Sequence, residues 1–229
     1  MTDYKNYNVW PSFVDLSISF VVLLTLILSA LIYKTAENKK KYDKVSQQQL
    51  KMQEEAKELL NFSLAKGDSN FLSLSLDSSK TMLIISLKKK QEIIFNSGSI
   101  KYTYKKKAEL SITALLDILK KFLEQKEQII GRIMVEGHTD ERPIKITSKN
   151  EFRSNWELSA ARAGKLVREF LGDNKDGPLA KYYNKFLAVG YANTQPTGKG
   201  YQNDRRISIK ITTATAEKLA SNFAITDSK

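Results

Sequence analysis

The chain has 229 residues, of which 41% are hydrophobic, and it carries a formal net charge of +12. This length allows one ordinary domain with appendages or two small domains. The absence of cysteine excludes a disulfide framework and a thiolate zinc site, and the single histidine, His138, excludes a multi-histidine metal site. We therefore expect no metal and no cofactor, while nucleic acid, anionic lipid and wall polymer all stay admissible partners for so basic a chain.

A long apolar segment lies close to the N-terminus. Between residues 12 and 33 the only charged side chain is Asp15, and the segment matches the roughly 20 residues that a helix needs to cross ~30 Å of hydrocarbon. Trp10 and Tyr33 flank it like the aromatic anchors of a membrane interface. A cleaved signal peptide fits less well, because the apolar run is too long and no A-x-A site follows. We predict a retained transmembrane helix over residues 12–33.

Asp15 is the informative residue of this segment, because an ionised acid at mid-bilayer costs about 2.5–3.5 kcal/mol on insertion scales. Helical spacing places Ser12, Asp15, Ser19 and Ser29 on one stripe, which should face protein rather than lipid. One interpretation is that Asp15 carries an ion or a proton reversibly. The other is that Asp15 snorkels or caps the helix start, and that the serines are ordinary packing residues.

The segment after the apolar run is polar. Its lysines between residues 34 and 44 would, by the positive-inside rule alone, place the C-terminal portion in the cytoplasm. Residues 36–62 are rich in Lys, Glu and Gln and contain no Gly or Pro, which favours an exposed or self-associating helix. Residues 67–70 (GDSN) end this pattern as a loop.

Strand and helix patterns alternate further along the chain. Period-two and apolar runs predict strands, and apolar residues at three- and four-residue steps predict helices. The predicted strands are 82–87, 93–96, 129–136, 186–191 and 207–212, and the predicted helices are 105–126 and 155–171. We predict an α+β fold, a small α/β sandwich with helices on one face of a mixed sheet. The predicted divisions are an N-terminal segment 1–11, a transmembrane helix 12–33, a linker 34–79, a folded domain 80–215 and a tail 216–229.

Three motifs in the predicted domain carry a resemblance to a known family. They are VEGHTDERPI (135–144), SNWELSAARA (154–163) and NDRRISIKI (203–211), preceded by IIFNSGS (93–99). Together with WPSFVDL and the single N-terminal span, they resemble the OmpA-like peptidoglycan-binding family as it occurs in the flagellar stator subunit MotB. The resemblance implies a C-terminal domain in the periplasm, an N-terminus in the cytoplasm and a span in the bacterial inner membrane. We adopt this orientation over the one that the lysines alone indicate.

The ligand that the resemblance implies is the diaminopimelate-type residue of the wall peptide. Such a zwitterion needs an acid beside an arginine whose planar fork holds a carboxylate. The resemblance implies that Asp140 and Arg162 are the principal ligands, that Thr139, Asn155 and Leu158 shape the pocket, and that Arg206 lines it. Without the resemblance, the residues alone favour structural roles: a turn position for Asp140, a solvated helix position for Arg162 and a surface strand position for Arg206.

Other residues near the motifs have structural interpretations. We expect His138 to be a hydrogen-bonded residue at a strand end and Trp156 to be a packing residue rather than a sugar platform. Asp204 stands where the family usually has asparagine, and Asn203 lies one position earlier, so a hydrogen bond from that asparagine is not carried over. We expect the lysine runs at 88–90 and 105–107 to be solvated surface, although Tyr102 and Tyr104 lie beside the second.

The resemblance also implies a mechanism. Two copies of the chain would place their membrane helices inside a ring of a multi-span MotA-like subunit, and the two Asp15 carboxylates would be loaded and discharged in turn. Peptidoglycan would hold the complex in place. The machine is either a flagellar stator or the related anti-phage Zorya system.

Two other functions fit the sequence. The chain could be a passive wall anchor in which Asp15 is incidental, or a basic nucleic-acid binder; the family resemblance leads us to expect no nucleic-acid partner. The sequence shows no nucleophile paired with a general base, no cluster of metal ligands and no phosphate-binding glycine loop. We therefore predict no enzyme activity.

Overall fold

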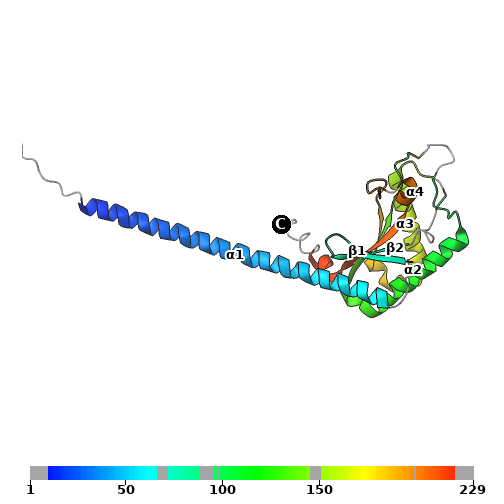
Figure 1. The fold of residues 1–229 in the computed structure, drawn as a ribbon, viewed down its shortest axis with the longest axis horizontal. Helices are drawn as coiled ribbons and strands as arrows, with labels where there is room; N and C mark the ends of the chain where they lie inside the picture. The colour runs from blue at the N-terminus through cyan, green and yellow to red at the C-terminus, as the bar shows by residue number, and fades with distance from the viewer. Residues whose placement is uncertain are drawn as a thin grey trace, which may run out of the picture. The chain divides into compact units, whose positions relative to one another are not determined.

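The computed structural model describes residues 10–65, 72–87, 95–96, 98–144, 151–198 and 200–219. The chain divides into two compact units, Met1–Gln48 and Gln49–Lys229. Helix α1 (Trp10–Ala65) contributes residues to both units (Figure 1).

The described part of the N-terminal unit is the first part of α1. Its apolar side chains are exposed, Phe20 and Leu26 by 61% and 64%, and α1 is the one helix in the described ranges that is long and apolar enough to cross a membrane. Serine hydroxyl groups on it bond to the backbone of the same helix: Ser19 donates to the Asp15 carbonyl oxygen at 2.9 Å, and Ser29 donates to the Thr25 carbonyl oxygen at 2.7 Å. Such bonds let small polar residues lie in a helix surrounded by hydrocarbon.

The C-terminal unit is built on a mixed five-stranded sheet with the order β1-β2-β5-β3-β4. Strands β3 and β4 are parallel, and the other neighbouring pairs are antiparallel. The strands are β1 (Leu72–Leu76), β2 (Met82–Leu87), β3 (Ile130–Gly137), β4 (Phe186–Gly190) and β5 (Ile207–Thr213). The helices are α2 (Lys105–Lys126), α3 (Asn155–Leu171) and the short α4 (Tyr201–Asp204), with 3₁₀ turns η2 (Glu127–Ile129) and η3 (Ala180–Lys185).

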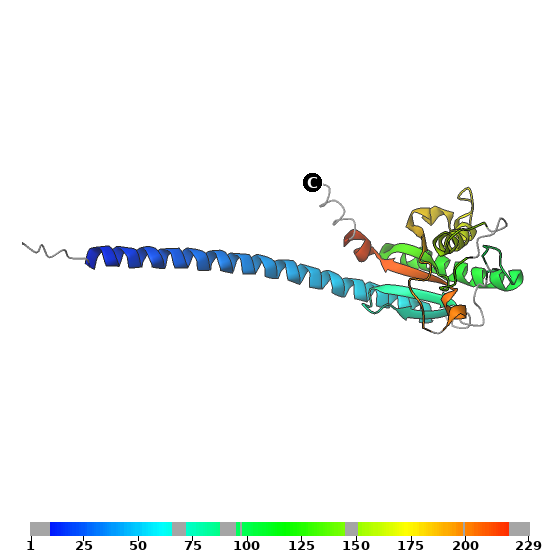
Figure 2. The same cartoon turned by 90° about the horizontal axis from the view of Figure 1, so that it is seen from above.

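Helices α2 and α3 cover the same face of the sheet (Figure 2). Alternate strand residues point into this layer, which explains the period-two pattern. From the strands the core takes Leu83, Ile85, Ile133, Val135, Ile209 and Ile211, and from the helices it takes Leu115, Leu119, Phe122, Leu166 and Phe170. The predicted α+β class with a mixed sheet is confirmed, and both helices have the bounds that their apolar periodicity indicated.

The folded unit begins earlier than residue 80, where the sequence analysis placed its start. In α1, Ala56 and Leu59 are fully buried, and the Phe62 ring lies 5.7 Å from the Phe122 ring. Lys126 forms an ion pair with Glu58 at 2.7 Å. Strand β1 also lies within residues 34–79, the predicted linker. A few apolar residues at helical spacing are enough to bury one side of α1 when a sheet edge and α2 are available to cover it.

The predicted strand 93–96 has a different form in its described part. Residues 93 and 94 lie outside the described residues, and Phe95 forms an isolated antiparallel bridge with Tyr102. The turn between them includes Gly98, whose φ of 64° is in the left-handed region that glycine adopts without a steric penalty. The loop therefore folds back on itself, and the carbonyl oxygens of Asn96 and Ser99 accept hydrogen bonds from Arg162 of α3.

Candidate functional site

Strand β3 ends beneath α3, and this junction forms the candidate site. Directly after β3 come His138, Thr139 and Asp140, all buried. The backbone N–H of Thr139 donates to the Ala192 carbonyl oxygen at 2.8 Å, and the N–H of Ala192 donates to the Ser159 hydroxyl at 3.0 Å. The residues after β3, the loop after β4 and the first turns of α3 are thus joined by hydrogen bonds.

Asp140 is a buried carboxylate with arginine side chains around it. Its side chain is 8% exposed, and Oδ2 accepts a hydrogen bond from Arg142 Nε at 2.9 Å. Arg205 Nε lies 3.5 Å from the same oxygen. Hydrogen bonding and charge attraction from Asp140 raise the pKa of Arg142. The Arg142 guanidinium also lies over the Tyr201 ring of α4, 5.1 Å from its centroid.

Arg162 comes from α3 and is 4% exposed. Its Nε donates to the Ser99 carbonyl oxygen at 3.2 Å and its Nη2 to the Asn96 carbonyl oxygen at 3.0 Å. The guanidinium lies over the Phe95 ring at 4.9 Å. Burial and the charge of Arg205 lower the pKa of Arg162 to about 10, against the opposing effect of the Asp140 charge. Asp140 and Arg162 are therefore electrostatic neighbours, although the described ion pairs of Asp140 are with Arg142 and Arg205.

Asn155 and the α3 cap fix the loop that carries Asp140. Asn155 Nδ2 donates to the carbonyl oxygens of Asp140 at 3.2 Å and of Arg142 at 3.0 Å. Ser154 caps α3 by accepting a hydrogen bond from the Glu157 N–H at 3.2 Å. The resemblance assigned Asn155 to the pocket, and its described contacts are with the backbone of the Asp140 loop.

Thr139 and Leu158 lie close to this junction and are both 4% exposed. Leu158 is an apolar residue of the first α3 turns. Thr139 Oγ1 is buried and has no hydrogen-bond partner among the described residues. A buried hydroxyl without a partner is uncommon in folded proteins and leaves a donor and acceptor for a ligand.

The described hydrogen bonds of Arg206, which the resemblance places along the pocket, are with backbone groups. Its Nη2 donates to the Gln195 carbonyl oxygen at 3.1 Å, and its own carbonyl oxygen accepts from the His138 N–H at 3.0 Å. Burial lowers the pKa of Arg206. The Asp140 carboxylate has its ion pairs with Arg142 and Arg205, two residues that the sequence analysis does not select. The signal available for them was their place within the matched motifs, two residues after Asp140 and directly before Arg206.

Comparison with known proteins places this arrangement in a family. The model of the OmpA family matches residues 94–210, which is more than half of the chain. This chain belongs to the OmpA family.

Two curated proteins of Bacillus subtilis (strain 168) resemble this OmpA family chain. An uncharacterized protein named YtxE is 35% identical over 126 residues, which cover 53% of this chain and 45% of the relative. Motility protein B is 34% identical over 85 residues, which cover 34% of this chain and 29% of the relative. The chain thus spans less than half the length of the curated relatives that it matches.

A solved structure shows the same fold. The crystal structure of a putative MotB-like protein from Desulfovibrio vulgaris aligns with a TM-score of 0.51 at 20% identity, and the alignment covers 72% of this chain and 94% of the other.

Where the family usually has asparagine, this OmpA family chain has Asp204 with a defined role. Asp204 Oδ1 accepts hydrogen bonds from the Thr197 N–H at 2.6 Å and from the Thr197 hydroxyl at 2.7 Å. These bonds lower the pKa of Asp204. The acid therefore holds the loop before α4, next to Arg205 and Arg206.

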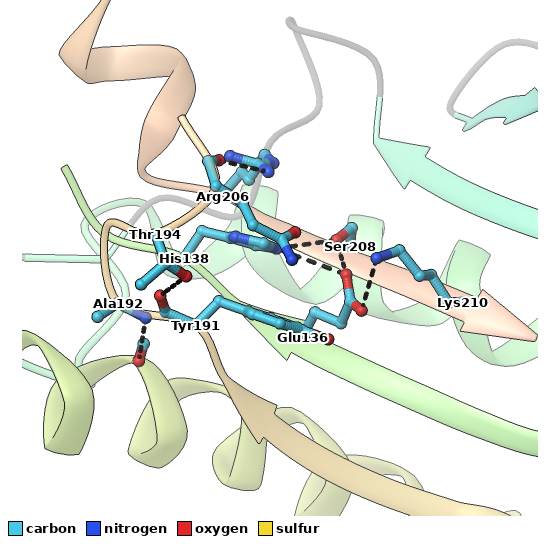
Figure 3. A network of polar contacts seen from close by, with 10 residues as sticks. Glu136, His138, Tyr191, Ala192, Thr194, Arg206, Ser208 and Lys210 are labelled. Atoms are coloured by element: carbon cyan, nitrogen blue, oxygen red, sulfur yellow. Dashed lines mark hydrogen bonds and ion pairs between the residues drawn. The ribbon is translucent and has the colours of Figure 1, made fainter. Parts of the chain in front are cut away.

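A buried polar network lies on the sheet face opposite the helices (Figure 3). Lys210 Nζ is 2.9 Å from Glu136 Oε1, and the Ser208 hydroxyl donates to Glu136 Oε2 at 3.0 Å. His138 Nε2 lies 3.3 Å from the Ser208 oxygen, and the imidazole stacks on the Tyr191 ring at 5.3 Å. Since the Ser208 proton goes to Glu136, His138 must donate from Nε2. The expected structural role of His138 at a strand end thus has specific partners.

Proposed function

We propose that this OmpA family chain anchors a membrane complex to peptidoglycan. The C-terminal unit lies in the periplasm and binds the wall peptide, residues 12–33 cross the inner membrane once, and the N-terminus is cytoplasmic. The proposal rests above all on one observation: the buried carboxylate of Asp140 and the buried guanidinium of Arg162 lie at the same junction of β3 and α3.

The charges at this junction fit a ligand that carries a carboxylate and an ammonium group. Among the described residues, Asp140 has ion pairs with Arg142 and Arg205 and an electrostatic attraction to Arg162, so the cluster has positive charge available for a ligand carboxylate. The Arg142 side chain is 57% exposed and can leave Asp140 when a ligand ammonium takes its place. The unpartnered Thr139 hydroxyl provides a further polar contact beside Asp140. A diaminopimelate-type residue matches these requirements.

Binding to isolated wall sacculi tests this proposal. The detergent-solubilised full chain should sediment with sacculi, and Asp140→Asn or Arg162→Gln should weaken retention by about 30-fold or more, because loss of one partner of a buried charge pair costs about 2–5 kcal/mol. The matched control is Asp117→Asn, which removes the same charge from an exposed position on α2. Retention of the Asp140 and Arg162 variants at the level of the Asp117 variant would contradict the proposal.

We further propose that the anchored complex is an ion-driven motor. Two copies of the chain stand within a ring of a multi-span MotA-like subunit, and Asp15 accepts and releases the coupling ion. One charge that crosses 100 mV contributes about 2.3 kcal/mol, which is comparable with the cost of an ionised acid in the membrane. Likeness to Motility protein B and the serine-lined Asp15 stripe support this proposal.

Replacement of Asp15 separates the motor from a passive anchor. The Asp15→Asn variant should still bind sacculi and copurify with the MotA-like subunit, but the motor should no longer perform its biological output. The output is swimming if the machine is a flagellar stator and protection from phage if it is a Zorya-type system. Full output from the Asp15→Asn variant would contradict the motor and favour a passive wall anchor.

A further inference from the structure

A second cleft lies between α2 and α3, and none of its lining residues belongs to the site described above. Its volume is about 530 Å³, within the range of small-ligand sites. The lining combines apolar, aromatic and charged side chains, namely Lys101, Tyr102, Lys105, Glu109, Ile112, Thr113, Leu116, Lys165 and Glu169. Among the described residues it brings three ammonium groups and two carboxylates around an apolar floor.

Tyr102 organises one wall of the cleft. Lys165 Nζ lies 4.0 Å from the centroid of its ring, and the Tyr102 hydroxyl donates to Glu169 Oε1 at 3.5 Å. Burial and the negative charge of Glu169 raise the pKa of Tyr102, so the phenol stays neutral. On the other wall Lys105 and Glu109 are 3.9 Å apart and both exposed. Positively and negatively charged groups therefore line the cleft together with the apolar side chains of Ile112 and Leu116.

The cleft is next to the Asp140–Arg162 junction along α3. The Phe95 ring lies 5.2 Å from the Tyr102 ring, and the Arg162 guanidinium lies 4.9 Å from the Phe95 ring. One aromatic side chain thus separates Arg162 from the wall of the cleft. Arg162, Lys165 and Glu169 also follow one another at helical spacing on α3.

We propose that this cleft binds an N-acetylated amino sugar of the glycan strand whose stem peptide occupies the Asp140–Arg162 junction. This inference rests on the proposed wall binding. A pyranose ring has an apolar face that suits Leu116 and Tyr102, and its hydroxyl and acetamido groups suit the lysines, the glutamates and Thr113. The stem peptide, which spans about 3.3–3.6 Å per extended residue, would connect the sugar in the cleft to the residue at the junction.

Glycan strands stripped of their peptides by an amidase test this inference directly. They cannot occupy the peptide site, so retention of the full chain on them reports the cleft alone. Lys165→Ala removes an ammonium from the cleft, and Thr113→Trp fills its mouth from an exposed position. Both variants should lower retention on stripped strands by roughly tenfold. The matched control, Lys120→Ala, removes an exposed lysine of α2 that does not line the cleft and should bind like the unmodified chain.

The two proposals fail in different ways. If the chain binds intact sacculi through Asp140 but is not retained on stripped strands, or if both cleft variants match Lys120→Ala, the glycan site is wrong and wall binding stands. Equal retention on poly-glutamate would also overturn the glycan site, because it would show only attraction between a basic surface and a polyanion. If the chain does not bind intact sacculi, wall binding itself is wrong.

Discussion

Ser159 of α3 approaches Gly137 of β3 so closely that a Cβ atom on Gly137 would lie 2.1 Å from the Ser159 carbonyl oxygen. Gly190 of β4 is related in the same way to Ala160, whose nitrogen would lie 2.6 Å from an added Cβ. Two neighbouring parallel strands therefore end in glycines under α3. This close approach sets the depth at which Arg162 lies beside the residues that follow β3.

Gly137→Ala should disturb both stability and binding, because a backbone oxygen cannot move aside as a flexible side chain does. We expect a destabilisation of about 1–3 kcal/mol or more, seen as a lower melting temperature of the full chain in detergent, together with weaker sacculus binding. The control is Gly164→Ala in α3, where an added Cβ meets nothing within 4 Å. That change should raise stability by about 1 kcal/mol, since alanine favours a helix over glycine. Equal melting temperatures for the two variants would refute the close approach.

The buried network around Glu136 predicts an acid-sensitive fold. Burial acts to raise the pKa of Glu136, but hydrogen bonds from His138, Lys210 and Ser208 and the charge of Lys210 outweigh it, so the pKa lies below its ordinary value of 4.5. The folded state therefore holds the carboxylate more strongly than the unfolded state does. This stabilisation is fully present above pH 4.5 and is lost as the pH falls through the folded-state pKa.

Glu136→Gln provides the measurement. The variant should melt below the unmodified chain at pH 7, and the gap between their melting temperatures should shrink as the pH is lowered from 5 towards 3. A gap that stays constant over this range would mean that Glu136 does not contribute through its charge.

The orientation of the chain can be tested with a single introduced thiol, because the chain contains no cysteine. Lys120→Cys places that thiol at an exposed position on α2. In spheroplasts, a maleimide that cannot cross membranes should label it without lysis. Labelling that appears only after lysis would put the C-terminal unit in the cytoplasm, as the lysines after the apolar segment indicate on their own.

The sequence was sufficient for the elements whose pattern is strong and local. Helices α2 and α3 follow directly from apolar residues at three- and four-residue spacing, and the strands β2, β3 and β5 from apolar runs between breaks. Strand β1 carries a clear signal of its own, the alternation of leucine and serine over Leu72–Leu76, but it is short and lies beside a polar helix. The burial of Glu55 against Thr215, at 2.8 Å, depends on a contact between distant segments that no local pattern contains.

The sequence motifs indicate which residues belong to the site, but they do not indicate which of these residues contact one another. The matched motifs indicate Asp140 and Arg162, and the structure brings both to one junction. The partners of Asp140 are Arg142 and Arg205, because the loop before β5 turns Arg206 toward Gln195 and Arg205 toward the carboxylate. Which of the two adjacent arginines faces Asp140 is decided by the backbone of that loop, including the hydrogen bonds of Asp204 to Thr197.

The most direct test of wall anchoring is a calorimetric titration of the full chain in detergent with a soluble stem peptide that carries free diaminopimelate. The unmodified chain should bind it, Asp140→Asn should weaken binding by about 30-fold or more, and Asp117→Asn should leave it unchanged. A stem peptide in which the diaminopimelate carboxylate is amidated should bind the unmodified chain weakly, because the arginines lose their partner. Equal affinity of the Asp140 and Asp117 variants for the free peptide would contradict the account.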